Sequence, residues 1–294
     1  MPDESHCCEV PLTRSLPPPG PYWRFTREER QLVALVFAAL LVPGNVERLA
    51  ELVQWHPPDL GDAEVAVELA YPRDLWASHR AQRGPSLLGQ EDFRAAILDC
   101  LQLSDDAWLR RCAVTEFNAF FGATPRPSDR FIQYPGRWSI RALTDPGRAH
   151  FITDPSELRK VCIYKFAHNA KPDLVILCPG GDVLCIEAKV GSREGSYPIP
   201  GQAPASQREV QRFLIDCLLG FRGHFVYLTR DRPSGDSPPA ANEMGISWLE
   251  VLQALDLSCA AEWVGNWVDD LVGAGEDERS RPDESGPEPR EDED

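Results

Sequence analysis

The sequence lacks any long hydrophobic run. No stretch of about 18 or more continuous apolar residues occurs, and the most apolar segment, Val33 to Val42, is too short to span a bilayer. Residues 1–4 are acidic, whereas a secretory signal begins with basic residues. These absences argue against a membrane-spanning or secreted chain. We therefore expect a cytoplasmic protein with no membrane partner.

Lysine is scarce, and the cysteines lack the spacing of a metal site. The chain has four lysines, one of which is Lys189, within a combined Lys and Arg count of 30. Its nine cysteines include no CxxC pair and no cluster with histidine at zinc-site spacing. We therefore expect reduced thiols that act as small apolar side chains, and neither disulfides nor a zinc cluster.

Positive charge is in short supply as well. The formal net charge is −16, of which residues 276–294 carry −7 and the remainder −9. Lys and Arg side chains that neutralise phosphates normally supply most of the non-specific affinity for nucleic acid. Any nucleic-acid binding by this acidic chain must therefore use a local basic groove together with a divalent metal ion.

The length and composition of the chain predict one large domain with additions. At 294 residues and 43% apolar residues, the chain can bury a full core. We expect an irregular, Pro-rich leader over 1–22, a helical region over 23–102, the main domain over 103–272 and a disordered acidic tail over 273–294.

Capping boxes and apolar spacing predict the remaining elements. A capping box at 26–29 begins a helix that Pro43-Gly44 ends, and a second box at 206–209 begins a helix to residue 219. Further helices are expected at 46–55, 63–70, 90–101, 104–121, 248–255 and 260–271. Strands are expected at 149–153, 161–166 and 224–229, the last one parallel to a strand of the hairpin described next.

Two apolar, β-branched segments flank a short turn in the middle of the chain. Residues 171–177 and 183–190 are separated by a Pro-Gly-Gly-Asp sequence, which is typical of a β-hairpin. Asp173, Glu187 and Lys189 interrupt these apolar runs. A buried charge costs several kcal/mol unless it is paired or bound to a metal, so the three charges point to a shared site.

The length of the turn decides whether the three side chains meet. A three-residue loop places Asp173 opposite Glu187, with Lys189 on the same face of the sheet. A two-residue loop would instead pair Asp173 with Ala188 and turn Glu187 to the other face. A common site therefore predicts the three-residue loop. The alternative is a hairpin whose charges lie at an exposed end of the sheet.

The three side chains suit the hydrolysis of a phosphodiester bond. Mg²⁺ binds through one or two carboxylates and keeps several waters, which leaves room for phosphate oxygens. Asp173 and Glu187 would provide those carboxylates. The ammonium of Lys189 would stabilise charge on the phosphate or orient the attacking water.

Pro172-Asp173 and Glu187-Ala188-Lys189 resemble the two motif halves of the PD-(D/E)xK nuclease superfamily. The resemblance implies a restriction-endonuclease-like α/β fold, with a mixed central sheet flanked by helices and here an N-terminal helical extension. The family core runs helix, three antiparallel strands, helix and a further strand. In this sequence we map that order to 104–121, a strand near 149–166, the hairpin, 206–219 and 224–229.

The resemblance also implies the members of the site. Asp173 and Glu187 would ligate Mg²⁺ or Mn²⁺, with the backbone carbonyl of Ala188 completing the coordination. Many members carry an acidic residue on the first helix, for which Glu116 is the best candidate, although an acid on the polar face of a helix is also ordinary. The following helix of RecB-like members adds a glutamine, which points to Gln207. The tyrosine expected four residues later is replaced by glutamine here.

The hypothesis is a metal-dependent nuclease that acts on DNA rather than RNA, in defence or repair. One alternative is a catalytically silent module of the same fold that binds nucleic acid or a protein partner. Another is a regulatory, antitoxin-like protein whose acidic tail mimics nucleic acid. A homodimer stays open, as does the role of the N-terminal helices.

Overall fold

A computed structural model describes most of the chain from residue 29 to residue 268. The described residues are 29–83, 87–104, 106–123, 131–189, 195–229, 243–258, 260, 262, 264, 266 and 268. The predicted leader at 1–22 and the predicted tail at 273–294 lie outside them, as does much of the helix expected at 260–271.

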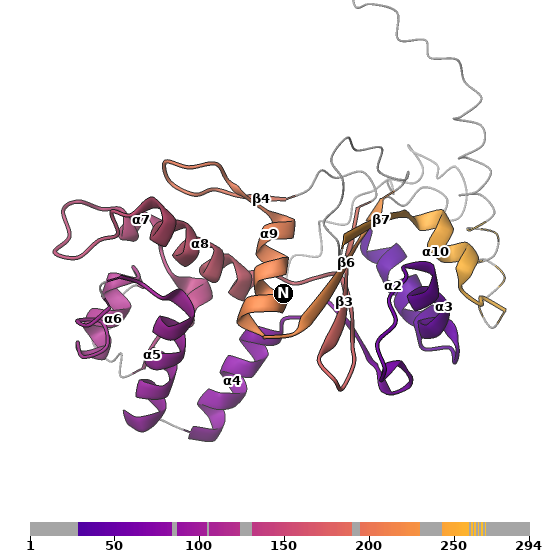
Figure 1. Ribbon diagram of the computed structural model, residues 1–294, viewed down its shortest axis with the longest axis horizontal. Coiled ribbons are helices and arrows are strands. Elements are labelled where there is room, and N and C mark those ends of the chain that lie inside the picture. The colour runs from indigo at the N-terminus through magenta and orange to yellow at the C-terminus, as the bar shows by residue number, and fades with distance from the viewer. Residues whose placement is uncertain are drawn as a thin grey trace, which may run out of the picture.

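A five-stranded mixed sheet forms the centre of the molecule (Figure 1). Its strands, in spatial order, are β1 (Glu64–Val67), β2 (Leu174–Leu177), β3 (Asp182–Ala188), β6 (Arg222–Thr229) and β7 (Glu243–Ser247). β2 runs antiparallel to both β1 and β3, whereas β6 is parallel to β3 and β7 is parallel to β6. A separate two-stranded sheet pairs β4 (Ser196–Tyr197) with β5 (Ala205–Ser206).

Helices flank the central sheet on both sides (Figure 1). One side carries α2 (Glu29–Leu40), α3 (Asn45–Leu52) and α10 (Trp248–Ala254). The other side carries α8 (Pro155–Asn169), α9 (Gln207–Arg212) and the π-helix η4 (Phe213–Leu218) that continues α9. Beyond them lie α4 (Tyr71–Arg83), α5 (Leu87–Leu101), α6 (Val114–Phe120) and α7 (Ile140–Leu143), with short 3-10 turns η2 (Leu60–Asp62) and η3 (Pro135–Arg137) elsewhere in the chain.

The central strands alternate their side chains between two apolar cores. Val175, Cys185 and Phe225 face the core that includes α8 and α9, whereas Ile176 and Leu184 face the core that includes α2, α3 and α10. A sheet covered by helices on both faces requires strands that are apolar on both faces. The predicted two-sided covering is therefore confirmed.

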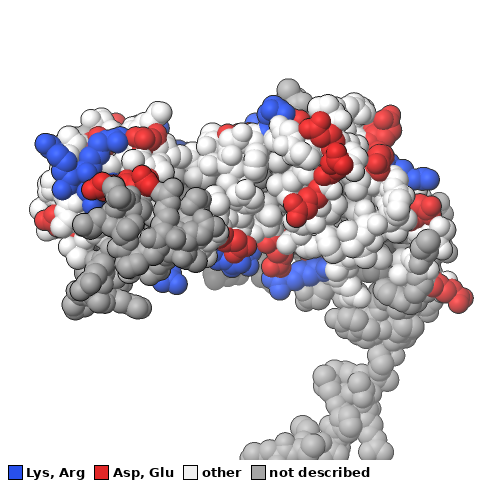
Figure 2. Space-filling view, turned by 90° about the horizontal axis from the view of Figure 1, so that it is seen from below, with Lys and Arg blue, Asp and Glu red and all other residues white. Residues whose placement is uncertain are grey.

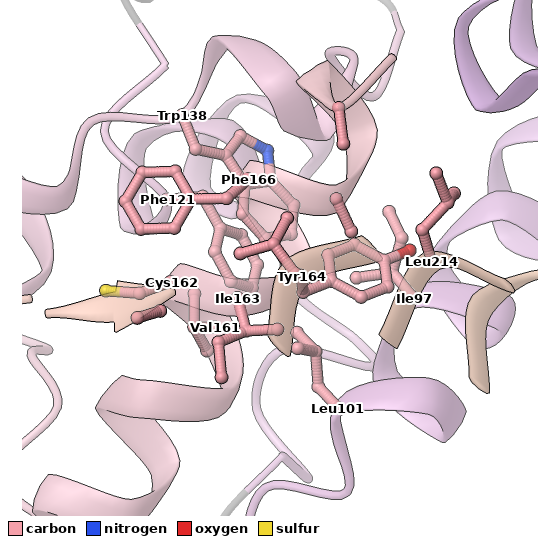
Figure 3. Close-up of a cluster of buried hydrophobic side chains, with 14 of the residues drawn as sticks. Ile97, Leu101, Phe121, Trp138, Val161, Cys162, Ile163, Tyr164, Phe166 and Leu214 are labelled. Carbon is pink, nitrogen blue, oxygen red and sulfur yellow. The ribbon is translucent and has the colours of Figure 1, made fainter. Parts of the chain in front are cut away.

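Aromatic rings link α8 to the helices farthest from the sheet (Figure 3). Phe121 stacks on Trp138 with ring centroids 3.8 Å apart, and Trp138 stacks in turn on Tyr164 of α8 at 5.6 Å. The second half of α8, from Val161 to His168, is buried except at Lys165, which is half-buried. This half of the helix therefore lacks the broad polar face that marks a surface helix.

Several elements differ from the sequence predictions. Residues 161–166, expected as a strand, lie within α8, because an apolar run fits a buried helix as well as a buried strand. No strand forms at 149–153. Residues 64–67, expected in a helix, form the edge strand β1, and the helix expected at 104–121 is reduced to α6.

The boundary predicted near residue 102, between a helical region and the main domain, does not separate two independent units in the structure. β1 and α2, both N-terminal to that point, belong to the central sheet and to one of its cores. α4 and β7 were not predicted. The expected helices at 46–55, 90–101 and 248–255 are present as α3, α5 and α10, and the helix expected from the first capping box is α2. The helix at 206–219 is α9 with η4, and the strand at 224–229 is β6, parallel to β3 as predicted.

Six cysteines in the described part of the chain are free thiols: Cys100, Cys112, Cys162, Cys178, Cys185 and Cys217. Cys112, Cys162, Cys178 and Cys185 are buried, and Cys217 is exposed. Burial raises the pKa of Cys185 well above its ordinary value, which keeps that thiol protonated. For the buried members, the predicted role as small apolar side chains is confirmed.

Among the described residues, no single helix has the length and apolar character needed to cross a membrane. α2 and α3 meet that test only when taken together, and they are bent by 117° at the break between them.

His168 is a titratable group inside the larger core. The residue is 6% exposed, and its Nδ1 lies 2.9 Å from the backbone oxygen of Tyr164. A carbonyl oxygen only accepts hydrogen bonds, so Nδ1 carries the proton of the neutral ring. Burial lowers the pKa of His168 from its ordinary value of 6.5 to about 4.

This burial predicts a loss of stability in acid. The unfolded chain binds a proton at His168 below about pH 6.5, whereas the folded chain binds it only near pH 4, so the free energy of unfolding should fall as the pH drops between these values. The expected contribution is about 3 kcal/mol. Urea unfolding at several pH values would measure it, and His168→Asn, which keeps a donor but does not titrate, should show a flatter dependence. An identical pH dependence in both proteins would contradict the prediction.

Candidate functional site

The β2–β3 turn fixes the positions of two acidic residues at the far end of the hairpin. The backbone nitrogen of Cys178 donates to the oxygen of Asp182 at 2.9 Å, which closes a three-residue loop. Gly181 in this loop has a φ of 84°, a left-handed conformation that favours glycine. The pairing of β2 with β3, continued by one residue, sets Asp173 opposite Glu187. The predicted loop length is confirmed.

Asp173 lies just before β2 and is held by backbone groups. Its Oδ2 accepts from the backbone nitrogen of Ala188 at 2.9 Å, and its carbonyl oxygen accepts from the nitrogen of Glu68 at 3.0 Å. In an extended strand, the N–H and C=O of one residue point to the same side, so the Ala188 carbonyl also points toward Asp173. Burial raises the pKa of Asp173, although the Ala188 amide and the charge of Lys189 oppose the shift.

Glu187 is buried, with the residue only 3% exposed, and three side chains donate to it. Its Oε1 accepts from the Lys189 ammonium at 2.6 Å and from the side-chain amide of Gln207. Its Oε2 accepts from the side-chain amide of Gln211. Both carboxylate oxygens are thus fixed in direction by neighbouring side chains.

Asp173 and Glu187 lie opposite each other, and the nearby positive charge is too small to keep both carboxyl groups ionised. Burial, followed by the negative charge of Asp173, raises the pKa of Glu187 to about 7, and the bonds from Lys189 and Gln211 only partly oppose this rise. Two carboxylates that share a site cannot both ionise at low cost. A cation placed between them would remove that cost.

Lys189 stays charged in this site. Burial alone would lower its pKa, but the hydrogen bond and the charge of Glu187 outweigh burial and raise the pKa. A second carboxylate, that of Glu29 on α2, lies 3.7 Å from the ammonium. The backbone of Lys189 is held by bonds to the oxygen of Leu228 at 2.7 Å and from the indole nitrogen of Trp248 at 3.2 Å.

The capped N-terminus of α9 places two glutamines beside Glu187. The hydroxyl of Ser206 accepts from the nitrogen of Glu209 at 3.1 Å and caps the helix. Gln207 and Gln211 are four residues apart and therefore lie on the same face. The Oε1 of Gln207 accepts from the nitrogen of Gly195 at 3.1 Å. Gln211 is 2% exposed, and its buried Oε1 has no partner among the described residues.

The structure brings together four of the predicted side chains but leaves out Glu116. Asp173, Glu187, Lys189 and Gln207 form the contacts described above. Glu116 is exposed on α6, away from the sheet (Figure 1), where its Oε2 accepts from the nitrogen of Ala113 at 2.8 Å. The sequence analysis maps the first helix of the expected core to 104–121, whereas the helices that precede β1 in the chain are α2 and α3.

Sequence reasoning missed Glu29 and Gln211. Glu29 is the last residue of the capping box that predicts the first helix. Had 64–67 been predicted as a strand, the acids of this helix would have been candidates for the site. Gln211 was noted only as a departure from the expected tyrosine. Its spacing from Gln207 was the available signal for a shared helix face.

The oxygen atoms of this site fit a hard divalent cation. Within the described residues, no group of three or more His, Cys, Asp or Glu side chains is placed to hold a metal ion. Mg²⁺ needs only one or two carboxylates together with other oxygens and water. Asp173, Glu187 and the carbonyl of Ala188 supply such a set, and the unpartnered oxygen of Gln211 is a further oxygen close by.

Comparison of this chain with protein-family models, with curated proteins and with solved structures gave no match.

The raised pKa of Glu187 predicts a loss of stability as the pH rises. The folded chain retains a proton on Glu187 up to about pH 7, whereas the unfolded chain releases it near pH 4.5, so the free energy of unfolding should fall between these values. The expected fall, in the presence of a chelator, is about 3 kcal/mol. Urea unfolding of the wild type and of Glu187→Gln would test this. The same fall in the variant would argue against the assignment to Glu187.

Proposed function

We propose that this chain is a metal-dependent nuclease of the PD-(D/E)xK type. The observation that carries the proposal is the convergence of Asp173, Glu187 and Lys189 at one end of the sheet, with the two acids on neighbouring strands. The charged side chains of the motif thus lie close together and do not point in different directions.

The order of the elements supports the same proposal. α2, the antiparallel strands β1, β2 and β3, then α9 and finally β6 follow the order of helix, three strands, helix and strand that the resemblance implies. In this assignment Glu29 takes the place on the first helix that the sequence analysis gave to Glu116. The helices α4 to α8 form an insertion between the first and second strands.

Each residue of the site has a separate role in the proposed hydrolysis of a phosphodiester bond. When bound, Mg²⁺ or Mn²⁺ would supply Lewis-acid stabilisation of the phosphate charge. Asp173, Glu187 and the Ala188 carbonyl would hold it, and Glu29 would offset part of the positive charge. Lys189 orients the attacking water or stabilises the phosphate with its ammonium. Gln207 positions Glu187 through its amide.

The distribution of charge restricts where nucleic acid would bind. Figure 2 views the molecule from below Figure 1, the side of the β2–β3 turn, and shows Lys and Arg side chains scattered among Asp and Glu. The described part of that face has no single basic patch. We propose phosphate contacts at the other end of the sheet because the Lys189 ammonium lies there, beside Glu187. DNA is proposed ahead of RNA, as the resemblance implies.

A second candidate function is a binding module of the same fold that does not turn over substrate. It is favoured by the donors on Glu187, because Lys189, Gln207 and Gln211 already occupy both carboxylate oxygens. Such a network can hold a buried carboxylate without a metal ion.

Metal binding separates the two functions. For a nuclease, calorimetric titration with MgCl₂ should show one site per chain, which Asp173→Asn abolishes, and the affinity should rise with pH up to about 7 as Glu187 loses its proton. For the silent module, no metal-dependent heat should appear, and nucleic acid or a protein partner should bind equally to wild type and Asp173→Asn.

Cleavage assays test the nuclease directly. Purified protein is incubated with plasmid, single-stranded DNA or RNA in the presence of Mg²⁺ or Mn²⁺. Asp173→Asn and Lys189→Ala should lower the rate by roughly 100-fold or more, because each removes a group that acts on the metal or the phosphate. Glu29→Gln should have a smaller effect, about tenfold, because Glu29 acts through Lys189 and the metal.

Glu116→Gln is the matched control. It also replaces an acid on a helix, but at an exposed position away from the site, so it should leave the rate unchanged. Circular dichroism would establish that each variant is folded. Equal cleavage by wild type, Asp173→Asn and Lys189→Ala would refute the nuclease assignment.

A further inference from the structure

A pocket with a volume of about 280 Å³ lies on the side of the sheet opposite α2 and α3. It is bounded by α4, α5, α8 and the end of η4. Its polar lining comes from a few groups, whereas most of its wall is apolar. This volume is near the lower end of the range of small-molecule sites, which are typically concave and apolar with a few convergent polar groups.

Aromatic and aliphatic side chains form the walls. Trp76 of α4 stacks on Phe93 of α5 with ring centroids 4.2 Å apart, and both line the pocket. Leu218 and Leu219 close the side formed by η4. Leu75 also lines the pocket and is 43% exposed. These walls favour a flat, apolar ligand.

Two residues with polar side-chain atoms line the pocket. Tyr164 and His168 are 4% and 6% exposed, and both line the pocket. Within the described residues, neither the Tyr164 hydroxyl nor the His168 Nε2 makes a hydrogen bond. Because the Nδ1 of His168 donates to the backbone oxygen of Tyr164, its Nε2 carries a lone pair and can only accept in the neutral ring.

Neither atom is among the fully buried polar atoms that lack a partner in the described structure, so both are open to the pocket. A ligand with an N–H or O–H group could hydrogen-bond to them there. A charged ligand would lose its hydration without gaining a buried counter-charge, because Asp92, the acid that lines the pocket, is itself exposed.

The pocket is distinct from the candidate nuclease site. Its contact with the continuous α9–η4 segment is at Leu218 and Leu219, whereas Gln207 and Gln211 at the start of that segment contact Glu187. No residue that lines the pocket donates to or accepts from Asp173, Glu187 or Lys189 in the described structure. The inference therefore does not rest on the nuclease proposal.

We propose that this pocket binds a small, uncharged aromatic molecule that carries a hydrogen-bond donor, with the ring between Trp76 and η4 and the donor on His168 Nε2. The size of the pocket suits a molecule of one or two fused rings. A side chain of a protein partner would present the same ring, but the small molecule is favoured because the two residues that carry the polar atoms, Tyr164 and His168, are only 4% and 6% exposed.

Calorimetric titration with indole and benzofuran tests this inference. The two molecules have nearly the same shape, but only indole has an N–H donor. Indole should bind the wild type with a Kd on the order of 0.1 to 1 mM, and benzofuran several-fold more weakly. Ala96→Phe, which fills the pocket from α5, should weaken indole binding at least tenfold.

Two further variants make the result interpretable. Ala77→Phe adds the same side chain at an exposed position of α4 that does not line the pocket, and it should bind indole like the wild type. Tyr164→Phe keeps the walls but deletes the hydroxyl, so any change in indole binding reports the polar end of the pocket. Thermal unfolding would show that the variants are folded. No saturable indole binding, or binding unchanged in folded Ala96→Phe, would overturn the proposal, as would benzofuran binding as tightly as indole.

Discussion

The candidate site depends on the register between β2 and β3. The three-residue turn places Asp173 and Glu187 opposite each other and on the face that α9 covers. A shift by one residue would turn Glu187, and Lys189 with it, into the core formed with α2 and α10, away from Asp173 and from the amides of α9. An ion pair buried in that apolar core without these partners would be costly. The apolar packing of both faces therefore enforces the geometry of the polar site.

Much of this arrangement could be predicted because it is local. Turn length and the alternation of faces define the register of a hairpin, so Asp173, Glu187 and Lys189 could be placed together from the sequence. Gln207 followed from the resemblance to RecB-like members alone. The electrostatic state of the site could not be predicted, because the pKa of Glu187 depends on burial and on side chains brought in by α2 and α9.

The parts that could not be predicted depend on distant contacts. β1 is a short edge strand whose partner, β2, lies far along the chain, so the local pattern of 64–67 gave no reason to prefer a strand. The second half of α8 is buried apart from the half-buried Lys165, so the run 161–166 has few of the polar positions of a surface helix. Because of these two errors, the sequence analysis places the first helix of the expected core at 104–121, whereas our proposal places it at α2. The choice of Glu116 over Glu29 followed from that displacement.

The two amides of α9 also limit how this chain can change in length. Gln207 and Gln211 reach the two oxygens of one carboxylate, so the helix has a fixed rotational phase relative to β3. One residue inserted between the Ser206 cap and Gln211 would rotate the later side chain by about 100° and remove its amide from Glu187. The segment between β4 and β5, at 198–204, precedes the cap and is free of that restriction. Evolutionary insertions and deletions near the site would thus be tolerated before Ser206 and eliminated within the first turns that follow it.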